Sequence, residues 1–453
     1  MRYLPHTQDE IAAMLAKIGK TSIDQLFEQI PEEVRLARPL AIDAPLDEPT
    51  LMQHLDELSR KNRGAELLSF LGAGAYDHPI SPAVDQLLLR SEFYTAYTPY
   101  QPEVAQGTLQ AIFEFQTIVS ELFGLPVANA SMYDGASAAA EAVLMAKRLT
   151  KRERVLVSSG IHPHYRATID TYLQGIGPGK EAIGALPLGD DGRSNLGALE
   201  ELASEELAAV VIGYPNFYGC VTEVRKLAEI AHRHGALLIT VTQEPFALSV
   251  LESPGELGAD IAVGEGQALG IPLQFGGPYA GLFACRDGRD FLQQIPGRLA
   301  GETVDKNGER GYVLTLSTRE QHIRRERATS NICTNTGLCA LAITIRMCML
   351  GKQGFLEAGR QCLAKAEYLK SKVRPLPGYS LVYPNTPTFN EFALRVRGNS
   401  AGRVVDLLEP KGFLAGLDLG RVDPRRADQL LVAVTERATR ADLDAFAAAL
   451  AAI

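Results

Sequence analysis

Helical segments alternate with short apolar segments between residues 107 and 286, and this alternation constrains the fold more than any other feature of the chain. The apolar segments are rich in valine, isoleucine and leucine and show no polar face. Strands of that kind are buried on both sides, so they belong to a mainly parallel sheet that is covered by helices on both faces. The expected series is helix 107–124, helix 136–149, strand 154–159, strand 208–216, helix 224–235, strand 236–242 and strand 281–286. The pattern predicts a large α/β domain.

The segments on either side of this domain have a different character. Ile11, Met14 and Ile18 recur at helical spacing, which is typical of an amphipathic helix that needs a partner surface. A long apolar helix is expected from Gly337 onward. It is followed by strands near 379–383, 391–396 and 430–434 and by helices near 401–410 and 440–452. We therefore expect a helical arm at 1–65, a large domain at 66–345 and a small C-terminal α+β domain at 346–453.

Composition narrows the functional class. The 453 residues are 46% hydrophobic and carry a formal net charge of -9. A dedicated nucleic-acid binder would need clustered basic residues, so the charge argues against that class and favours a soluble enzyme. We expect no membrane span, since no apolar run is long enough, and no signal peptide, since MRYLPHTQDE lacks a basic and apolar start. A cytoplasmic protein is the expectation.

The six cysteines do not suggest a metal site. The closest pair, Cys333 and Cys339, has neither the spacing of zinc or redox motifs nor histidine partners nearby. We expect reduced, mostly buried thiols and no bound metal.

Several segments resemble the glycine decarboxylase family, called P-protein of the glycine cleavage system. The segments are YLPHT near the N-terminus, YTPYQPEVAQGTLQAIFEFQT at 97–117, NASMYDGASAAAEA at 129–142, REQHIRRERATSNICTNTGLCAL at 319–341 and LAGLDLG at 414–420. The resemblance extends over the whole chain and is greatest to the α subunit of the two-chain bacterial form. It implies the fold of type I pyridoxal-phosphate-dependent transferases, with a large parallel-sheet domain and a small C-terminal domain.

The resemblance also implies an activity and partners. Together with a β subunit, in an expected α2β2 heterotetramer, the chain would support pyridoxal-phosphate-dependent decarboxylation of glycine. The aminomethyl group would pass to the lipoyl arm of H-protein. Two alternatives remain open from the residues: a non-catalytic structural or regulatory scaffold of the same fold, and a self-sufficient enzyme that uses Lys147 or Lys306 in an unexpected position.

Gln267 stands where this family carries its cofactor lysine. In the β subunit that lysine lies in a strand-loop ending in Gly-Gly-Pro, which is similar to residues 276–278 here, and alignment on this tripeptide places Gln267 opposite it. A carboxamide nitrogen is not nucleophilic and cannot form the Schiff base that holds pyridoxal phosphate. The chain has no lysine between Lys226 and Lys306. We therefore expect this chain to bind no cofactor covalently, with pyridoxal phosphate on the β subunit.

The other elements of a cofactor site are incomplete. Gly135, Ala136 and Ser137 begin a helix, where the family cradles the cofactor phosphate, but the same residues suit a plain helix cap. His162 corresponds to the histidine that stacks on the cofactor ring in the family, and it could equally be a packed remnant. Glu244 lies near, but not at, the position of the acid that pairs with the pyridine nitrogen. We expect a vestigial pocket made of Gly135, Ala136, Ser137, His162 and Gln267.

Two surface segments are candidates for contact with partners. Tyr97, Tyr100 and Gln101 lie in a segment rich in tyrosine and proline, which the resemblance places at a subunit interface near the mouth of the partner's active site. They would either reach that site or form a rigid interface loop. The basic run at 319–327, with four arginines and His322, would bind an acidic surface or be a solvated face paired with Glu320 and Glu326.

Overall fold

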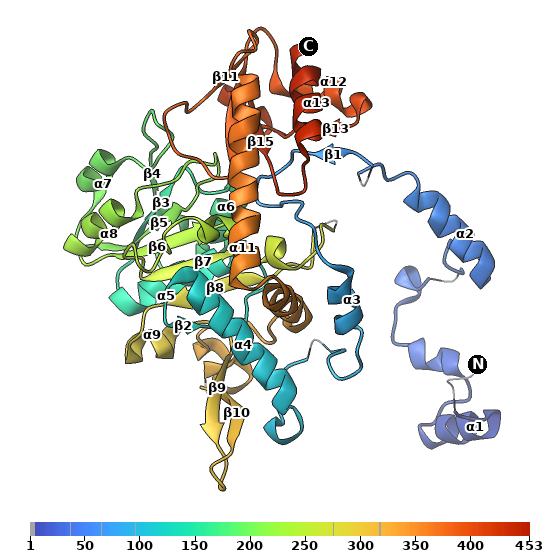
Figure 1. The fold of residues 1–453 in the computed structure, drawn as a ribbon. Helices are drawn as coiled ribbons and strands as arrows, with labels where there is room; N and C mark the ends of the chain where they lie inside the picture. Colours follow the sequence, from blue (N-terminus) through green and yellow to red (C-terminus); the bar gives the residue numbers. More distant parts are fainter. Residues whose placement is uncertain (1–4, 37, 65, 96, 275, 317–318) are drawn as a thin grey trace. The chain divides into compact units, whose positions relative to one another are not determined.

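The computed structural model of the chain describes residues 5–453 apart from 37, 65, 96, 275 and 317–318. It contains two compact units, Met1–Arg63 and Gly64–Ile453 (Figure 1). The helical arm expected at 1–65 stays a prediction. The further boundary expected at 345 falls inside a continuous helix of the second unit and stays a prediction.

The N-terminal unit is helical and leaves its apolar side chains exposed. Thr7 and Glu10 form a capping box at the start of the first helix. Among the described residues of this unit only Leu15 is buried. Its helices are α1 (Gln8–Lys17), η1 (Ile23–Phe27), η2 (Glu32–Val34) and α2 (Glu48–Ser59).

The second unit is built on a seven-stranded sheet with the order β2-β8-β7-β6-β5-β3-β4. Neighbours from β7 to β4 are parallel, and β8 runs antiparallel to both of its neighbours. The expected strands at 154–159, 208–216, 236–242 and 281–286 are all present. The strands are β2 (Val127–Ala128), β3 (Arg154–Ser158), β4 (Ile183–Leu186), β5 (Leu207–Gly213), β6 (Leu237–Thr242), β7 (Ile261–Glu265) and β8 (Gly281–Cys285).

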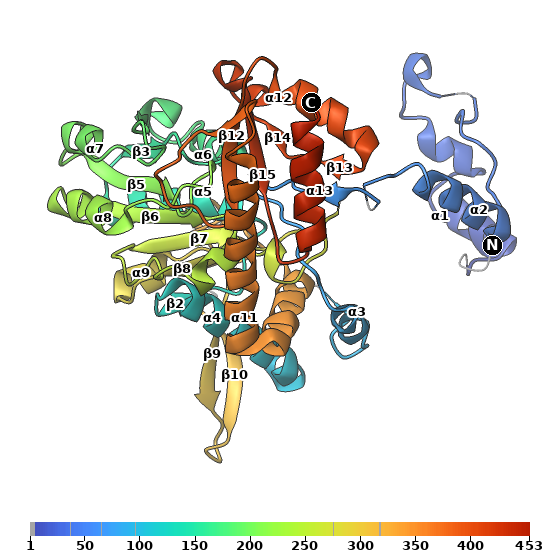
Figure 2. The same ribbon diagram turned by 45° about the horizontal axis from the view of Figure 1, so that its top comes forward.

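Helices cover both faces of this sheet, as a parallel sheet requires (Figures 1 and 2). One face packs against α5 (Gly135–Thr150) and α6 (Pro163–Leu173), and alternate strand residues such as Val155, Val211 and Val263 point toward them. The opposite face packs against other helices that include α4 and the first half of α11. The remaining helices of the domain are α3 (Pro82–Leu88), α4 (Gln106–Phe123), α7 (Leu196–Leu202), α8 (Val224–Arg233) and α9 (Arg289–Gln294).

The helix α11 (Gly337–Val373) joins the large sheet to the small C-terminal sheet (Figures 1 and 2). Gly351 has a φ of 57° and interrupts the helical backbone, so two helical segments meet there at a kink. Among the described helices, α11 alone is long and apolar enough to cross a bilayer by length and composition. It contacts α4, α13 and the short helix η5 (Pro245–Ser249).

The small sheet is antiparallel, with the order β11-β12-β15-β14. The strands and helices expected in this region are all found within a few residues of their predicted bounds. Its apolar face packs against α11 and α13, through side chains such as Leu369, Leu394 and Phe446. The elements are β11 (Tyr379–Leu381), β12 (Glu391–Val396), β14 (Leu417–Asp418), β15 (Gln429–Ala433), α12 (Ala401–Leu408) and α13 (Arg440–Ala451).

Two pairs of strands outside the two larger sheets were not predicted from the sequence. The polar stretch after β8 contains a projecting hairpin, β9 (Leu299–Val304) and β10 (Arg310–Thr315), whose turn is held by Asp305. A short parallel pair, β1 (Leu68–Ser69) and β13 (Phe413–Leu414), joins the start of the second unit to the small domain. Both pairs are short or half-exposed, so neither leaves a strong apolar pattern in the sequence.

Candidate functional site

The carboxyl ends of β3, β6 and β7 meet the N-terminus of α5, and this is where ligands bind in open α/β sheets. A segment from far earlier in the chain, residues 70–78, crosses this place. We call residues 70–78 the strap. The vestigial pocket expected from the sequence therefore consists of three sheet ends, one helix start and the strap.

The start of α5 is a complete helix cap. Asp134 accepts a hydrogen bond from the Ser137 N–H at 2.7 Å, and the Ser137 hydroxyl lies 3.1 Å from the Asp134 N–H. The start of α5 is thus a helix cap, which was the alternative left open for Gly135, Ala136 and Ser137. The Gly135 N–H, which also faces away from the helix, donates to the Glu265 carboxyl at 3.0 Å.

The Glu265 carboxyl lies where three backbone N–H groups converge. Besides Gly135, the N–H groups of Gln267 and Ala280 donate to its second oxygen, at 3.1 and 3.3 Å. Burial raises the pKa of Glu265 to about 8, against the lowering effect of these hydrogen bonds, and the nearby charge of Asp134 raises it further. Glu265 was not singled out from the sequence, although a charged residue at the end of an apolar strand was a usable signal.

The Gln267 side chain is buried and both of its polar atoms are bonded. Its Oε1 accepts from the Tyr76 N–H at 3.2 Å, and its Nε2 donates to the Ile271 carbonyl at 2.7 Å. One bond holds the strap and the other holds the turn after β7. The residue opposite the family's lysine is thus a structural link inside the chain.

The strap covers His162. The His162 Nε2 lies 3.0 Å from the Ala73 carbonyl oxygen, so it donates there, and Phe217 packs edge-on at 4.9 Å between ring centroids. A Cβ added at Gly74 would lie 3.5 Å from the His162 ring and 3.6 Å from the Gln243 amide nitrogen. Burial lowers the pKa of His162 to about 4, so the ring is neutral. The chain's own backbone lies against this ring, and the packing matches the alternative of a packed remnant.

The strap is anchored from the small domain through Glu391. This carboxyl accepts from the Ala73 N–H at 2.6 Å and from the Tyr76 hydroxyl at 2.9 Å. Burial raises the pKa of Glu391 to about 8, and the charge of Glu244 adds to this effect. A second buried carboxyl therefore faces the same pocket.

Glu244 is committed to another buried group. Its Oε2 lies 2.9 Å from His78 Nε2 and accepts from the Asn390 amide at 3.2 Å, while His78 Nδ1 lies 2.6 Å from Glu436. Burial alone would lower the pKa of His78, but the charges and hydrogen bonds of Glu244 and Glu436 raise it to about 9. The acid expected near the pyridine-nitrogen position is thus the partner of a buried imidazolium.

A cofactor does not fit this pocket. A small cavity beside the pocket, bounded by Tyr76 of the strap, Gln243, Glu244 and Glu391, measures about 10 Å³, which is space for roughly one water molecule. A Cβ at Gly135 would overlap the Tyr165 hydroxyl, so the start of α5 is tightly packed as well. The positions that would hold a phosphate, a ring and a Schiff base are occupied by Glu265, the strap and Gln267.

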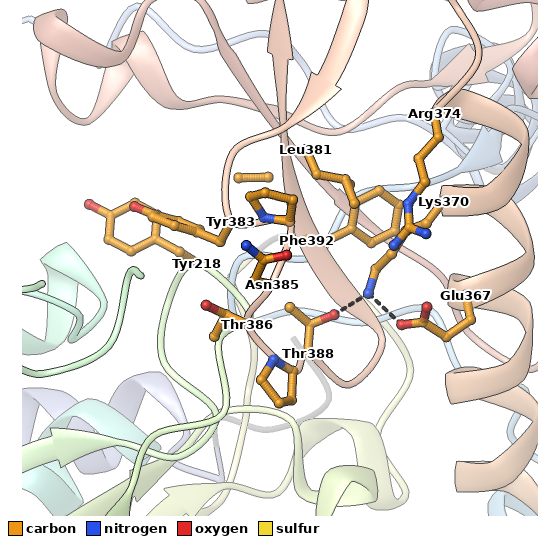
Figure 3. A pocket seen from close by; sticks show the side chains of 13 residues that line it. Tyr218, Glu367, Lys370, Arg374, Leu381, Tyr383, Asn385, Thr386, Thr388 and Phe392 are labelled. Atoms are coloured by element: carbon orange, nitrogen blue, oxygen red, sulfur yellow. Dashed lines mark hydrogen bonds and ion pairs between the residues drawn. The ribbon is translucent and has the colours of Figure 1, made fainter. Parts of the chain in front are cut away.

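The lysines considered as substitutes lie elsewhere. Lys147 is in the last turn of α5, roughly 18 Å along the helix from Gly135, and pairs with Glu153 at 2.6 Å. Lys306 is in the turn of the β9–β10 hairpin. A third lysine, Lys370, lines a separate cavity of about 280 Å³ formed by Tyr218 and residues between 367 and 393. Its amine is bonded to Glu367 and Thr388 (Figure 3).

The tyrosine and proline segment is exposed, and its members differ. Tyr97 is 80% exposed, whereas Tyr100 is 53% exposed and its hydroxyl accepts from Arg298 at 2.7 Å. The Arg298 guanidinium also lies 4.8 Å from the Tyr100 ring centroid. Gln101 precedes a short 3-10 turn and is exposed. The role of these residues toward a partner stays a prediction.

The basic run at 319–327 contains residues that are bonded within the chain and residues that are exposed. Arg319 donates to the carbonyl groups of Ile295 and Gly297, so it is a structural residue. Glu320 pairs with buried Arg298 at 3.1 Å and lies 3.3 Å from His322. Arg327 is exposed and lies 3.9 Å from Glu326. Arg324, Arg325 and Arg327 are exposed, so these arginines present charge at the surface.

Three of the six cysteines are buried, and Cys333 and Cys348 are exposed. Cys362 lies 3.4 Å from Glu436, in the His78 cluster, which brings together three potential metal ligands. Arg346 approaches Glu436 at 3.8 Å and supplies positive charge there. The cluster is therefore already balanced by hydrogen bonds and ion pairs.

Comparison with known proteins places these features in a family. The model of the glycine cleavage system P-protein family matches residues 1–450. Proteins of Sorangium cellulosum and Desulforamulus reducens, each named probable glycine dehydrogenase (decarboxylating) subunit 1, are 64% and 50% identical over the whole chain and 99% and 100% of their own length. The fold is that of type I pyridoxal-phosphate-dependent enzymes, shared at a TM-score of 0.67 and 15% identity with a sphingosine-1-phosphate lyase of Burkholderia pseudomallei over 91% of this chain and 92% of the lyase.

A crystal structure of glycine decarboxylase (P-protein) of the glycine cleavage system, in an inhibitor-bound form, is 43% identical with a TM-score of 0.88 and full coverage of both chains. The chain belongs to the glycine cleavage system P-protein family. The subunit designation of its relatives also indicates a second subunit.

Proposed function

We propose that this chain is the first, or α, subunit of a two-chain glycine decarboxylase of the glycine cleavage system. The observation that carries the proposal is the conflict between family and pocket. The relatives at 64% and 50% identity are named as a decarboxylating glycine dehydrogenase, yet this chain's cofactor positions are filled by Glu265, Gln267 and the strap. Catalysis then requires pyridoxal phosphate on the second subunit.

The cofactor supplies the electron sink for loss of CO2 from glycine, and it would do so in the partner's pocket. This chain's contribution is assembly and the shape of the entry path for the lipoyl arm of H-protein. Exposed apolar residues support this role. Met14, Ile18 and Phe27 on the N-terminal unit and Tyr94, Tyr97 and Val104 on the second unit are each at least 46% exposed, which is characteristic of surfaces that bind another chain.

We propose an α2β2 assembly in the cytoplasm, with an obligate interface well above about 2,000 Å². Two surfaces would contribute to it. The N-terminal unit would bind the β subunit. The segment from Phe93 to Gln106 would lie near the mouth of the partner's active site. The exposed Arg325 and Arg327 offer cationic groups to an acidic partner, which is consistent with H-protein as a candidate.

The test is reconstitution. The chain, the second subunit from the same genome and the two together are purified and assayed for glycine–CO2 exchange with lipoylated H-protein. We expect activity only from the pair. Activity of this chain alone, or of the second subunit alone at the rate of the pair, would contradict the proposal. A pair that forms no complex would equally contradict it.

A further inference from the structure

The Glu265 side chain occupies a place where three backbone N–H donors could otherwise hold an oxyanion. Its three donors are backbone N–H groups from three separate segments: the start of α5, the turn after β7 and the loop before β8. Groups of this kind bind phosphate and carboxylate ligands because they are fixed in direction and belong partly to a helix N-terminus. Here the bound group is attached to the same chain.

The surroundings keep this place narrow. Gly135 has no side chain, and a Cβ there would overlap the Tyr165 hydroxyl and lie 3.0 Å from the Gly264 carbonyl. Gly266 is similarly restricted by Ile343 and by the Ala280 carbonyl, at 2.6 and 2.9 Å from an added Cβ. The donors are therefore held by close packing and would remain in position without the Glu265 side chain.

We propose that the N–H groups of Gly135, Gln267 and Ala280 form a latent oxyanion site that Glu265 fills from within the chain. It is this carboxyl, rather than the missing lysine, that excludes the phosphate group of a cofactor. The ligand class is inorganic phosphate or the phosphate end of a monoester. The inference concerns this chain by itself and does not depend on the proposed function.

The strap should admit inorganic phosphate and exclude the larger phosphate monoesters. Ala73 and Gly74 lie against His162, so the ring of a phosphate monoester would have to displace them. Inorganic phosphate needs only the volume of the Glu265 side chain. Inorganic phosphate is therefore the probe, and pyridoxal phosphate serves as a second probe for the strap.

The test compares Glu265→Ala with two matched variants of the full chain. Glu265→Gln keeps the side chain's size and fills the site, and Gln267→Lys restores the lysine but leaves Glu265 in place. Thermal unfolding is followed in increasing phosphate, with sodium chloride at equal ionic strength as reference. We expect a saturable rise in Tm for Glu265→Ala alone. No phosphate-specific rise for that variant, or an equal rise for Glu265→Gln, would overturn the proposal.

A folding defect in Glu265→Ala also gives an answer. If the variant is insoluble in chloride, the proposal requires that phosphate restore soluble protein during refolding, because an oxyanion replaces the lost acceptor. Failure in both salts would contradict it. Pyridoxal phosphate should raise the Tm of Glu265→Ala less than inorganic phosphate does, and an equal or greater rise would show that the strap does not block the ring.

A substitution of Asp134 tests where the phosphate binds. Its charge lies close enough to raise the pKa of Glu265, so it would repel a bound phosphate. Asp134→Ser keeps a capping oxygen for the Ser137 N–H and removes that charge. In the Glu265→Ala background it should tighten phosphate binding severalfold. Unchanged or weaker binding would place the phosphate elsewhere and overturn the assignment.

Discussion

The vestigial pocket and the N-terminal unit differ in whether their side chains find partners within the chain. In the pocket, Glu265, Gln267, Glu391 and His78 are buried and each finds partners within the chain. In the N-terminal unit, apolar side chains such as Ile18 and Phe27 remain exposed, although the helices α1 and α2 have capped N-termini. The pocket's polar groups are bonded within the chain, whereas the N-terminal unit leaves many apolar side chains exposed.

This difference indicates which part of the chain remains available to bind another molecule. A pocket that has filled itself with hydrogen-bonded groups contributes stability and holds the strap, and it has little room for chemistry. An exposed apolar surface contributes nothing to an isolated chain and gains free energy when a partner covers it. The chain retains the fold of type I pyridoxal-phosphate-dependent enzymes, and its exposed apolar residues are the surface on which the proposed role in assembly rests.

Deleting residues 1–36 should have the largest effect, because it removes most of the exposed apolar residues of the N-terminal unit. We expect the truncated chain to lose tight association with the second subunit, measured by co-elution and by sedimentation. Its own Tm should stay unchanged, since Gly64–Ile453 is a compact unit by itself. Retained association at full-length affinity would show that this surface is not part of the interface.

His78→Gln should destabilise the chain strongly. The substitution leaves Glu244 and Glu436 buried without the imidazolium between them, and breaking a buried ion pair in this way costs about 3–5 kcal/mol. Urea unfolding measures the loss. His164→Gln, at an exposed histidine, is the control and should change stability by less than about 0.5 kcal/mol. Similar losses in both variants would mean that the His78 cluster has no special contribution.

Stability should fall as pH rises. Glu265 and Glu391 have pKa values of about 8 in the folded chain against an ordinary 4.5, and His78 about 9 against 6.5. Each raised pKa means that the folded state holds a proton the unfolded state has lost, so stability is fully present below the unfolded pKa and declines up to the folded one. The decline should be steepest between pH 6.5 and 8. It should continue to about pH 9 in the wild type and flatten above pH 8 in His78→Gln.

The two tyrosines should separate a surface role from a structural one. Tyr97→Phe removes an exposed hydroxyl, so it should leave stability unchanged and lower glycine–CO2 exchange of the assembled pair by up to roughly tenfold if the hydroxyl reaches the partner's site. Tyr100→Phe removes the acceptor for Arg298 and should cost about 1.5–3 kcal/mol of stability. Wild-type exchange in the assembled Tyr97→Phe complex would leave that residue with a packing role only.

Periodicity predicted most of this fold, because the strands of a two-sided sheet and the helices that cover it carry strong apolar patterns. The strands at 154–159 and 236–242 and the helix ended by Gly124 were found near their predicted bounds. The β9–β10 hairpin was missed because its strands are only partly buried and its alternation is broken by Gly301 and Gly311. Pairing between β1 and β13 joins residues far apart in sequence, which periodicity cannot show.

The site was predicted less completely. Gln267 could be recognised because the chemistry of a Schiff base excludes a carboxamide, and the cap at Asp134 and Ser137 follows from local sequence. The strap and Glu391 could not be found in this way, since they reach the pocket through tertiary contacts across more than 300 positions. Glu265 and His78 are single polar residues whose importance depends on burial, which the sequence does not state.

The central claim is that the cofactor of the assembled enzyme lies on the second subunit while this chain's pocket is filled from within. Borohydride reduction of the reconstituted, pyridoxal-phosphate-loaded complex, followed by peptide mapping, tests it most directly. The account predicts one pyridoxyl lysine in the second subunit and none in this chain, with the same result for Gln267→Lys. A stoichiometric pyridoxyl lysine in this chain would contradict it.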